Sequence, residues 1–147
     1  MKWFTTKLST FYFCLIIISG FFFDQLSKIL IVSKLGLGES IDFGIFALHY
    51  LQNTGASFSL LPNATDFLTV FSLIVVVVII SCYKKINVKH RLFFALIVSG
   101  ALGNLLDRIR LGYVIDFLDF KIWPVFNIAD TLVFIGAFSL MYVIWKE

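Results

Sequence analysis

Charged residues are scarce in this sequence. Only 14% of its 147 residues are Asp, Glu, Lys or Arg, whereas 60% are apolar. A soluble domain of this length has too small an interior to bury so many apolar side chains. The composition therefore excludes an ordinary soluble enzyme. It indicates a single membrane domain over residues 1–147, with the lipid bilayer as its solvent.

Cysteine and histidine are also rare, with two of each. Cys14 and Cys82 fall inside apolar runs, where we expect them to be buried as small apolar side chains. They offer no disulfide framework, and neither His49 nor His90 has a partner at a metal-ligand spacing. We therefore expect no metal and no other cofactor.

Four apolar segments are long enough to cross a bilayer as helices, which requires about 20 residues for roughly 30 Å. They cover residues 11–32, 67–83, 92–111 and 128–145. The third is strongly apolar only to Leu106, so it must use Asp107–Leu111 to reach across. The first is too long for the core of a cleavable signal peptide, and we expect it to remain as a span.

Basic residues are distributed unevenly between the segments outside these spans. Seven of the twelve lie in the two terminal tails and in the loop between the second and third spans: Lys2, Lys7, Lys84, Lys85, Lys89, Arg91 and Lys146. Because lysine and arginine stay preferentially on the cytoplasmic side, we predict that both termini are cytoplasmic. The loops 33–66 and 107–127 then face outward.

The first outer loop, residues 33–66, has the pattern of a small sheet. Apolar residues alternate with polar or small ones over Ile41–Ile45, which predicts a strand with one apolar face. Asn53–Gly55 predicts a turn, and the period of two returns over Phe58–Leu60. The predicted fold is an all-α membrane protein with four transmembrane helices and a small extracytoplasmic β-sheet on the membrane surface.

Ionisable side chains inside a span cost about 2.5–3.5 kcal/mol or more at mid-bilayer, so they are functional candidates. Asp24 and Lys28 are spaced i,i+4 in the order that favours a helical ion pair, and this pair can be structural or can support a site. The small residues of Ser99–Gly103 favour the close approach of another helix.

Polar residues also gather at the outer end of the third span. Asn104 shares a helix face with Asp107 and Arg108. Two interpretations stay open for this group. Arg108 and Asp107 can form a structural pair at the helix end, or the guanidinium can hold a carboxylate or a backbone carbonyl at a site.

Two aspartates on the same outer side are the strongest catalytic candidates. Asp116 follows β-branched residues, which favour extended chain, so Asp116 and Asp119 point to opposite faces. Asp130 opens the fourth span three residues after Asn127, a spacing typical of an N-cap and capping box. On this pattern Asp130 can be structural, and its pairing with Asp116 favours a catalytic role.

Two facing carboxyl groups that share one proton can hydrolyse a peptide bond. The ionised group takes a proton from water, and the neutral group donates to the carbonyl oxygen. Proximity of like charges and partial burial allow the half-protonated pair to persist near neutral pH. The helix dipole favours charge on Asp130, which makes Asp116 the expected protonated partner. No phosphate-binding loop, HExxH sequence or nucleophile elbow is present.

At these residues the chain resembles the lipoprotein signal peptidases (signal peptidase II), the intramembrane aspartyl proteases that process bacterial prolipoproteins. Five motifs in order carry the resemblance: Asp24-Gln25 with Lys28, Asn53–Phe58, Gly100–Arg108, Gly112–Phe117 and Phe126–Asp130. The resemblance implies that Asp116 and Asp130 are catalytic. It implies supporting positions at Asp24, Asn53, Gly55, Asn104, Asp107, Arg108, Asn127 and Ala129, to which Lys28 is added as the helical partner of Asp24.

The resemblance also implies a substrate and a location. The expected partners are a prolipoprotein signal peptide, cleaved just before a cysteine that carries diacylglycerol, and membrane lipid; nucleic acid and metal are not expected. The site would lie near the outer face of the bacterial cytoplasmic (inner) membrane. Ser57, where the family usually has alanine, is a minor departure.

Two other function classes compete with this interpretation. Arg108, Gly112, Asp116 and Asp119 faintly resemble the metal-binding signature of CDP-alcohol phosphotransferases, although its opening Asp-Gly is missing and one spacing is a residue short. A proton-coupled carrier or an assembly factor could use the same carboxylates without catalysis. Metal-dependent activity would favour the phosphotransferase. Transport without lipoprotein processing would favour the carrier.

Overall fold

The computed structural model describes residues 2–55 and 65–147, with side chains from Lys7 onward. These residues form the helices α1 (Lys2–Lys34), α2 (Thr65–Cys82), α3 (Arg91–Leu111) and α4 (Ile128–Trp145) and the strands β1 (Ser40–Asp42), β2 (Ala47–Asn53) and β3 (Val114–Asp119). Two short 3-10 helices, η2 (Tyr83–Lys85) and η3 (Val88–His90), connect α2 to α3. The four α-helices are long and apolar enough to cross a membrane, which confirms the predicted fold class.

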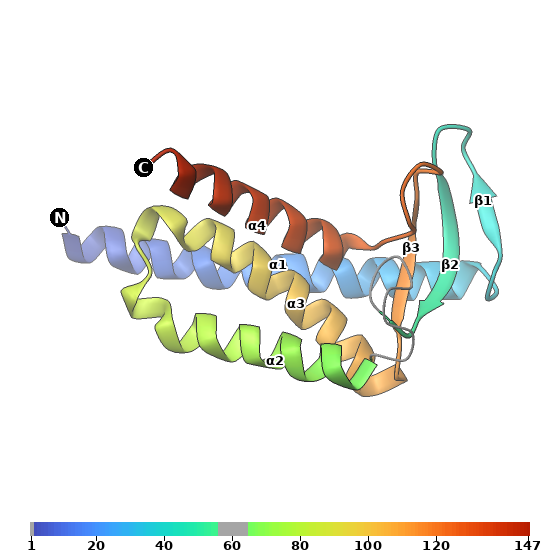
Figure 1. Cartoon of the computed structure of the whole chain (residues 1–147), viewed down its shortest axis with the longest axis horizontal. Helices are drawn as coiled ribbons and strands as arrows, with labels where there is room; N and C mark the ends of the chain where they lie inside the picture. The colour runs from blue at the N-terminus through green and yellow to red at the C-terminus, as the bar shows by residue number, and fades with distance from the viewer. Residues whose placement is uncertain (1, 56–64) are drawn as a thin grey trace.

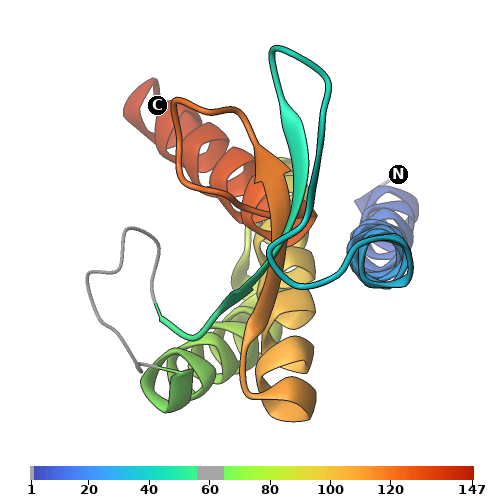
Figure 2. The same cartoon turned by 90° about the vertical axis from the view of Figure 1, so that its right-hand side faces the viewer.

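α3 is the central helix, since it packs against α1, α2 and α4. In the end-on view of Figure 2 the other three helices lie around it. Both chain termini and the α2–α3 connection lie at one end of the bundle, and the sheet lies across the other end (Figure 1). The polar motifs that include the end of β2, β3 and the start of α4 therefore lie at the sheet end of the bundle.

The end of α3 nearer the sheet extends as far as the sequence predicted. The helix continues through the polar residues to Leu111. It ends at Gly112, which has φ 80° and donates its backbone N–H to the Arg108 carbonyl at 3.0 Å. Glycine adopts this left-handed conformation without a Cβ penalty, so it terminates the helix and directs the chain into β3.

The three strands form an antiparallel sheet in the order β1-β2-β3. The strand predicted over Ile41–Ile45 is wrong after Asp42, where β1 ends. The chain turns at Gly44, which has φ 89°, and Lys121 holds the turn by binding the Asp42 carboxylate and the Gly44 carbonyl. The pattern over Phe58–Leu60 lies outside the described residues.

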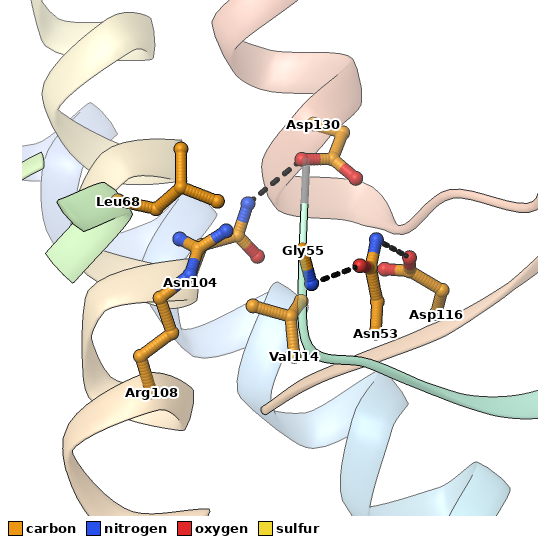
Figure 3. Close-up of a pocket in the computed structure, with 8 residues that line it drawn as sticks. All are labelled: Asn53, Gly55, Leu68, Asn104, Arg108, Val114, Asp116 and Asp130. Atoms are coloured by element: carbon orange, nitrogen blue, oxygen red, sulfur yellow. Dashed lines mark hydrogen bonds between the residues drawn. The ribbon is translucent and has the colours of Figure 1, made fainter. Parts of the chain in front are cut away.

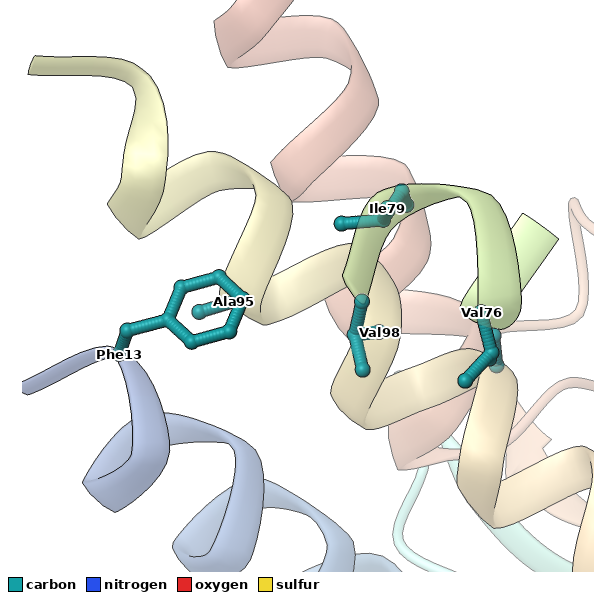
Figure 4. Packing of buried hydrophobic residues seen from close by; sticks show 6 residues of the cluster. Phe13, Val76, Ile79, Ala95 and Val98 are labelled. Atoms are coloured by element: carbon teal, nitrogen blue, oxygen red, sulfur yellow. The ribbon is translucent and has the colours of Figure 1, made fainter. Parts of the chain in front are cut away.

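Two apolar clusters stabilise the two ends of the bundle. Phe13 of α1, Val76 and Ile79 of α2 and Ala95 and Val98 of α3 pack together in the half of the bundle nearer the termini (Figure 4). A second cluster joins the end of α1 to the sheet and consists of Ile31, Leu35, Tyr50, Ile115 and Phe117. The buried polar side chains described below come from the elements that these two clusters hold together.

A buried arginine, Arg91, lies at the end of the bundle opposite the sheet. Arg91 stacks on the Tyr83 ring with its guanidinium carbon 4.3 Å from the ring centroid. It donates to the Tyr83 hydroxyl at 2.9 Å and to the Ile86 carbonyl at 3.3 Å. These contacts connect α3 to the segment that follows α2.

The expected burial of the two cysteines is wrong. Cys14 and Cys82 are both exposed on the helix surfaces. In a bilayer these surfaces face lipid, so an apolar residue gains no more from the interior than from the outside. Membership of an apolar run therefore carries no information about which side of a membrane helix a residue occupies.

Candidate active site

A buried cluster of three charges connects α1 to α3. Lys28 Nζ lies 2.8 Å from Asp24 Oδ2, one turn earlier in α1, and 2.8 Å from Asp107 Oδ2 on α3. All three residues are buried, and Lys28 is only 1% exposed. The predicted i,i+4 pair therefore forms, and it extends to a second carboxylate. Removing one member of a buried ion pair costs about 3–5 kcal/mol, because the other charge stays in a poor solvent.

Gln25 completes this cluster and is absent from the predicted site residues. Its side-chain amide donates to Asp107 Oδ1 at 3.0 Å and lies 3.2 Å from Asp24 Oδ2. Its position beside Asp24 in the first motif was the available signal. Helical geometry alone does not reveal that Gln25 bridges the two acids, because that depends on where α3 lies.

Asp24 also connects α1 to α4. Its Oδ1 accepts the backbone N–H of Ala129 at 2.8 Å. This N–H belongs to the first turn of α4, where backbone donors have no partner within the helix. The carboxylate therefore satisfies a free helix terminus and sets the position of α4 relative to α1.

The small residues of α3 permit these contacts, as the sequence predicted. A Cβ on Gly100 would lie 2.2 Å from the Ala129 carbonyl oxygen, and a Cβ on Gly103 would lie 2.5 Å from Asp24 Oδ2. A side chain at position 100 would therefore meet backbone and force α3 and α4 apart, and one at position 103 would force the Asp24 carboxylate to shift. The absence of side chains here brings α3 into direct contact with the start of α4.

Asp116 lies in the middle of β3 and is buried, with 3% of its surface exposed. Its Oδ2 accepts from Asn53 Nδ2 of β2 at 2.9 Å, and its Oδ1 accepts from Asn127 Nδ2 at 2.6 Å. Asp119 is partly exposed at the end of the strand, where its carboxylate accepts the Lys121 backbone N–H. The two aspartates therefore occupy different surroundings, as the strand alternation predicts.

Asn127 caps α4, and Asp130 follows it in the first turn. The predicted cap is confirmed, since Asn127 Oδ1 accepts the Asp130 backbone N–H at 2.8 Å. The Asp130 carboxylate, however, accepts from Asn104 Nδ2 of α3 at 2.7 Å. Its side chain is thus directed toward α3, and the capping interpretation explains Asn127 but not the direction of Asp130.

Asp116 and Asp130 line one pocket of about 200 Å³, shown in Figure 3. The other residues that line it come from β2 and the turn after it, α2, α3 and β3: Asn53, Gly55, Leu68, Asn104, Arg108 and Val114. Gly55 donates its backbone N–H to Asn53 Oδ1 at 3.0 Å, which forms the predicted turn and orients Asn53 toward Asp116.

Two of these lining residues were missed by sequence reasoning. Val114 could have been found, because it lies two residues before Asp116 and so shares its face of the strand. Leu68 had no signal, since it is one apolar residue among many in α2. The part of the motif over Ala56–Phe58 lies outside the described residues.

Arg108 contributes a positive charge to the pocket rather than a local ion pair. Within residues 2–55 and 65–147, no ion pair joins it to Asp107, whose carboxylate binds Lys28, Gln25 and the Ile115 backbone N–H. Of the two interpretations of Arg108, the structure favours a role within the pocket.

The surroundings of Asp116 change its proton affinity. Burial raises the pKa of Asp116 to about 7, and the negative charge of Asp130 adds to this rise. The hydrogen bonds from Asn53 and Asn127 and the charge of Lys28 oppose it. A carboxyl group in this range can hold or release a proton near neutral pH, which suits general acid–base chemistry.

Known proteins were compared with this chain and this site. The family described as "Signal peptidase (SPase) II" matches residues 16–146. The chain belongs to the signal peptidase II family. It is 43% identical over 128 residues to a lipoprotein signal peptidase of Halothermothrix orenii, covering 84% of this chain and 88% of that protein. It is 42% identical over 131 residues to a lipoprotein signal peptidase of Streptococcus pyogenes serotype M2, covering 84% and 86%.

Solved structures of bacterial membrane enzymes share this fold. A bacterial membrane enzyme determined by the in meso method at 2.3 Å resolution has a TM-score of 0.85 and 28% identity, and covers 92% of this chain and 88% of its own. A second, at 1.9 Å resolution, has a TM-score of 0.84 and 28% identity, with coverages of 92% and 94%. The signal peptidase II family, the four membrane helices and the small sheet identify a multi-pass bacterial membrane protease that acts in lipoprotein processing.

Proposed function

We propose that this signal peptidase II is an aspartyl endopeptidase whose catalytic pair is Asp116 and Asp130. It removes the signal peptide of a diacylglyceryl-modified prolipoprotein by cleaving just before the lipidated cysteine. The observation that supports this most directly is the shared pocket. Two carboxyl groups from β3 and α4 line it, and each accepts a hydrogen bond from one of two asparagines that are bonded to each other.

The proposed reaction uses one proton shared by the pair. Asp116, whose pKa lies near 7, holds it, while Asp130 stays ionised in the first turn of α4. The Asp130 carboxylate takes a proton from a water molecule as the water oxygen bonds to the scissile carbonyl carbon. Asp116 donates its proton to the carbonyl oxygen, which forms a tetrahedral diol.

Breakdown of the diol completes hydrolysis. Asp116 takes back a hydroxyl proton as the carbonyl reforms, and Asp130 transfers the water-derived proton to the amide nitrogen while the C–N bond breaks. The products are the carboxylic acid of the signal peptide and the free amine of the lipidated cysteine, between which one proton then passes to give a carboxylate and an ammonium group. The pair supplies both acid and base, so the proposal needs no metal, and activity is expected to persist in excess EDTA.

The remaining polar residues are proposed to support this pair. Asn53, with the turn at Gly55, and Asn127 hold Asp116, and Asn104 holds Asp130. Arg108 adds positive charge beside the substrate carbonyl. The contact of Asp24 with Ala129, together with Asp107 and Lys28, sets the relative positions of α1, α3 and α4.

We further propose that the termini are cytoplasmic and that the pocket lies near the outer face. Seven basic residues belong to the end of the bundle that holds both termini, and the aspartate pair lies toward the sheet end (Figure 1). A site at the outer rim of the hydrocarbon is accessible to water and to the junction between a membrane-embedded signal peptide and its lipidated cysteine.

The experiment that tests the catalytic pair uses three conservative variants. Asp116→Asn, Asp130→Asn and Asp119→Asn are expressed in a bacterium lacking its own enzyme, and precursor accumulation is followed in membranes that contain equal amounts of each protein. The first two are expected to abolish processing, because an amide cannot exchange the shared proton, while Asp119→Asn processes normally. Normal processing by Asp116→Asn or Asp130→Asn would refute the proposal.

A further inference from the structure

Lys28 donates one hydrogen bond in addition to its two ion pairs. Its ammonium group has three N–H donors, and three acceptors surround it. Two are the carboxylates of Asp24 and Asp107 at 2.8 Å, and the third is Asn104 Oδ1 at 3.1 Å. An ammonium group cannot accept a hydrogen bond, so the atom of Asn104 that faces it must be the amide oxygen.

This contact determines the direction of the whole Asn104 amide. With Oδ1 turned toward Lys28, Nδ2 points the other way and donates to Asp130 Oδ1 at 2.7 Å. An inverted amide would place its NH₂ group against the ammonium and its oxygen against a carboxylate. Both of those contacts are repulsive, so Lys28 selects the orientation in which Asp130 receives a donor.

The second asparagine is oriented in a complementary way. Asn127 Oδ1 accepts the Asp130 backbone N–H, so its Nδ2 faces Asp116 Oδ1 and also lies 3.2 Å from Asn104 Oδ1. Asn104 Oδ1 is therefore the point where donors from Lys28 and Asn127 meet. The chain of hydrogen bonds that reaches both aspartates has its positive end at Lys28.

We infer that Lys28 is a positioning residue of the reaction, which acts through Asn104 to hold a donor on the Asp130 carboxylate. The inference rests on the proposed catalytic pair and adds a role to what would otherwise be a structural charge. Without Lys28, only the 3.2 Å contact from Asn127 Nδ2 opposes inversion of the Asn104 amide. The amide then turns over more readily, and Asp130 loses the hydrogen bond that fixes its carboxylate for taking a proton from water.

The effect of net charge can be separated from the effect of Asn104 orientation, because a second substitution within the Asp24–Lys28–Asp107 cluster restores its net charge. Among the described residues, the charged groups that act on the aspartate pair are Asp24 and Lys28 on α1 and Arg108 on α3. Asp107 on α3 lies against Lys28 and acts on Arg108. Lys28, Asp24 and Asp107 together carry a net charge of −1 when ionised. Lys28→Met makes it −2, and adding Asp24→Asn returns it to −1 without restoring a donor to Asn104.

The test measures kcat and KM against pH for purified enzyme in lipid–detergent micelles with a diacylglyceryl prolipoprotein peptide. Lys28→Met is expected to lower kcat by about 10- to 100-fold, the usual effect of losing a partner that orients an active-site group. KM should stay unchanged, and the pH–rate profile should move to higher pH because positive charge is lost. In the double variant Lys28→Met/Asp24→Asn, the pH–rate profile should return to that of the wild-type enzyme, while kcat stays low.

A matched control is a buried cation at the other end of the bundle. Arg91 is 6% exposed and contacts Tyr83 and Ile86, not the pocket. Arg91→Met is expected to lower the melting temperature and leave the pH–rate profile in place. Lys28→Gln, which keeps a donor but not the charge, replaces Lys28→Met if that variant does not fold, and it should retain more kcat than the double variant.

Several results would overturn the inference. One is a Lys28→Met enzyme with unchanged kcat and pH profile, and another is full recovery of kcat in the double variant, which would leave Lys28 a role through charge alone. A fall in kcat that only follows the folded fraction would show a structural role. Activity retained by Asp116→Asn or Asp130→Asn would instead remove the proposed function itself.

Discussion

Asn104 and Asn127 are hydrogen bonded to each other at 3.2 Å, and each donates to a different aspartate of the pocket. They belong to α3 and to the start of α4, so one pair of amides connects two helices and a strand. The carboxyl groups are therefore held by neutral donors rather than by direct salt bridges. Neutral donors orient a carboxyl group without forcing it to remain ionised, which a shared proton requires.

The first prediction concerns Asn127, which caps α4 and also holds Asp116. Asn127→Ala should destabilise the protein by about 1 kcal/mol, the usual cost of losing an N-cap, and should also reduce kcat strongly because Asp116 loses its shortest hydrogen bond. Melting temperature and kcat are measured together. Asn87→Ala is the control, since Asn87 caps η3 far from the pocket. Equal loss of activity in both variants would contradict the prediction.

The second prediction follows from the pKa of Asp116, which burial raises to about 7 in the folded protein from its ordinary value of 3.8. Between these pH values the folded chain binds a proton that the unfolded chain does not. This contribution to stability is fully present below pH 3.8 and is lost as the pH rises to 7. Its size is on the order of 4 kcal/mol, from about 1.4 kcal/mol for each pH unit.

Melting temperatures measured from pH 4 to pH 8 provide the test. The wild-type protein should become less stable as the pH rises through this window, and Asp116→Asn should show a shallower decline because residue 116 no longer titrates. Asp119→Asn should follow the wild-type curve. An equally steep decline in Asp116→Asn would show that other groups control the pH dependence.

The third prediction concerns the close contact between α3 and α4. Gly100→Ala should destabilise the protein by about 1–3 kcal/mol, the range for overpacking a core, because the new methyl group meets the backbone oxygen of Ala129 rather than a movable side chain. Val77→Ile adds a similar volume at a surface position of α2 that is 52% exposed, and should be neutral. Thermal unfolding in detergent compares the two, and a neutral Gly100→Ala would mean that the helices can separate freely.

The fourth prediction concerns orientation in the membrane. In a background with Cys14→Ala and Cys82→Ala, an impermeant maleimide added to spheroplasts should label Ile122→Cys, because Ile122 is 93% exposed beside the sheet. Lys84→Cys, at the end of the bundle that holds the termini, should react only after permeabilisation. The reverse labelling pattern would place the pocket on the cytoplasmic side.

Local sequence patterns predicted the helices well, because hydropathy and length suffice for a membrane span. The same patterns failed where the deciding contact is distant in the chain. β1 ends early because Lys121 reaches Asp42 and Gly44, and no local pattern links those residues. The predicted burial of the cysteines was wrong for another reason. Lipid is as apolar as the protein interior, so hydropathy does not distinguish the two sides of a membrane helix.

The site residues show a similar division. The acidic residues, Lys28 and Asn127 were found through local anomalies, such as an acid inside an apolar span or an asparagine before a helix. The site roles of Asn53, Gly55 and Ala129 came only from the family resemblance. Their connections could not be predicted, because Asp24 meets the Ala129 N–H and Asn104 meets Asp130 only after three helices have packed. Gln25 was missed because its one signal, its position beside Asp24 in the first motif, does not reveal its partner Asp107 on α3.

The bond between Asp24 and the Ala129 N–H has a consequence for biogenesis. It joins α1 to α4, which is synthesised after the other three described helices. A nascent chain that ends before residue 128 already contains Asp116 but has neither Asp130 nor this latch. On the proposed mechanism such a chain has only one of the two catalytic carboxyl groups, so activity would arise only after α4 is inserted.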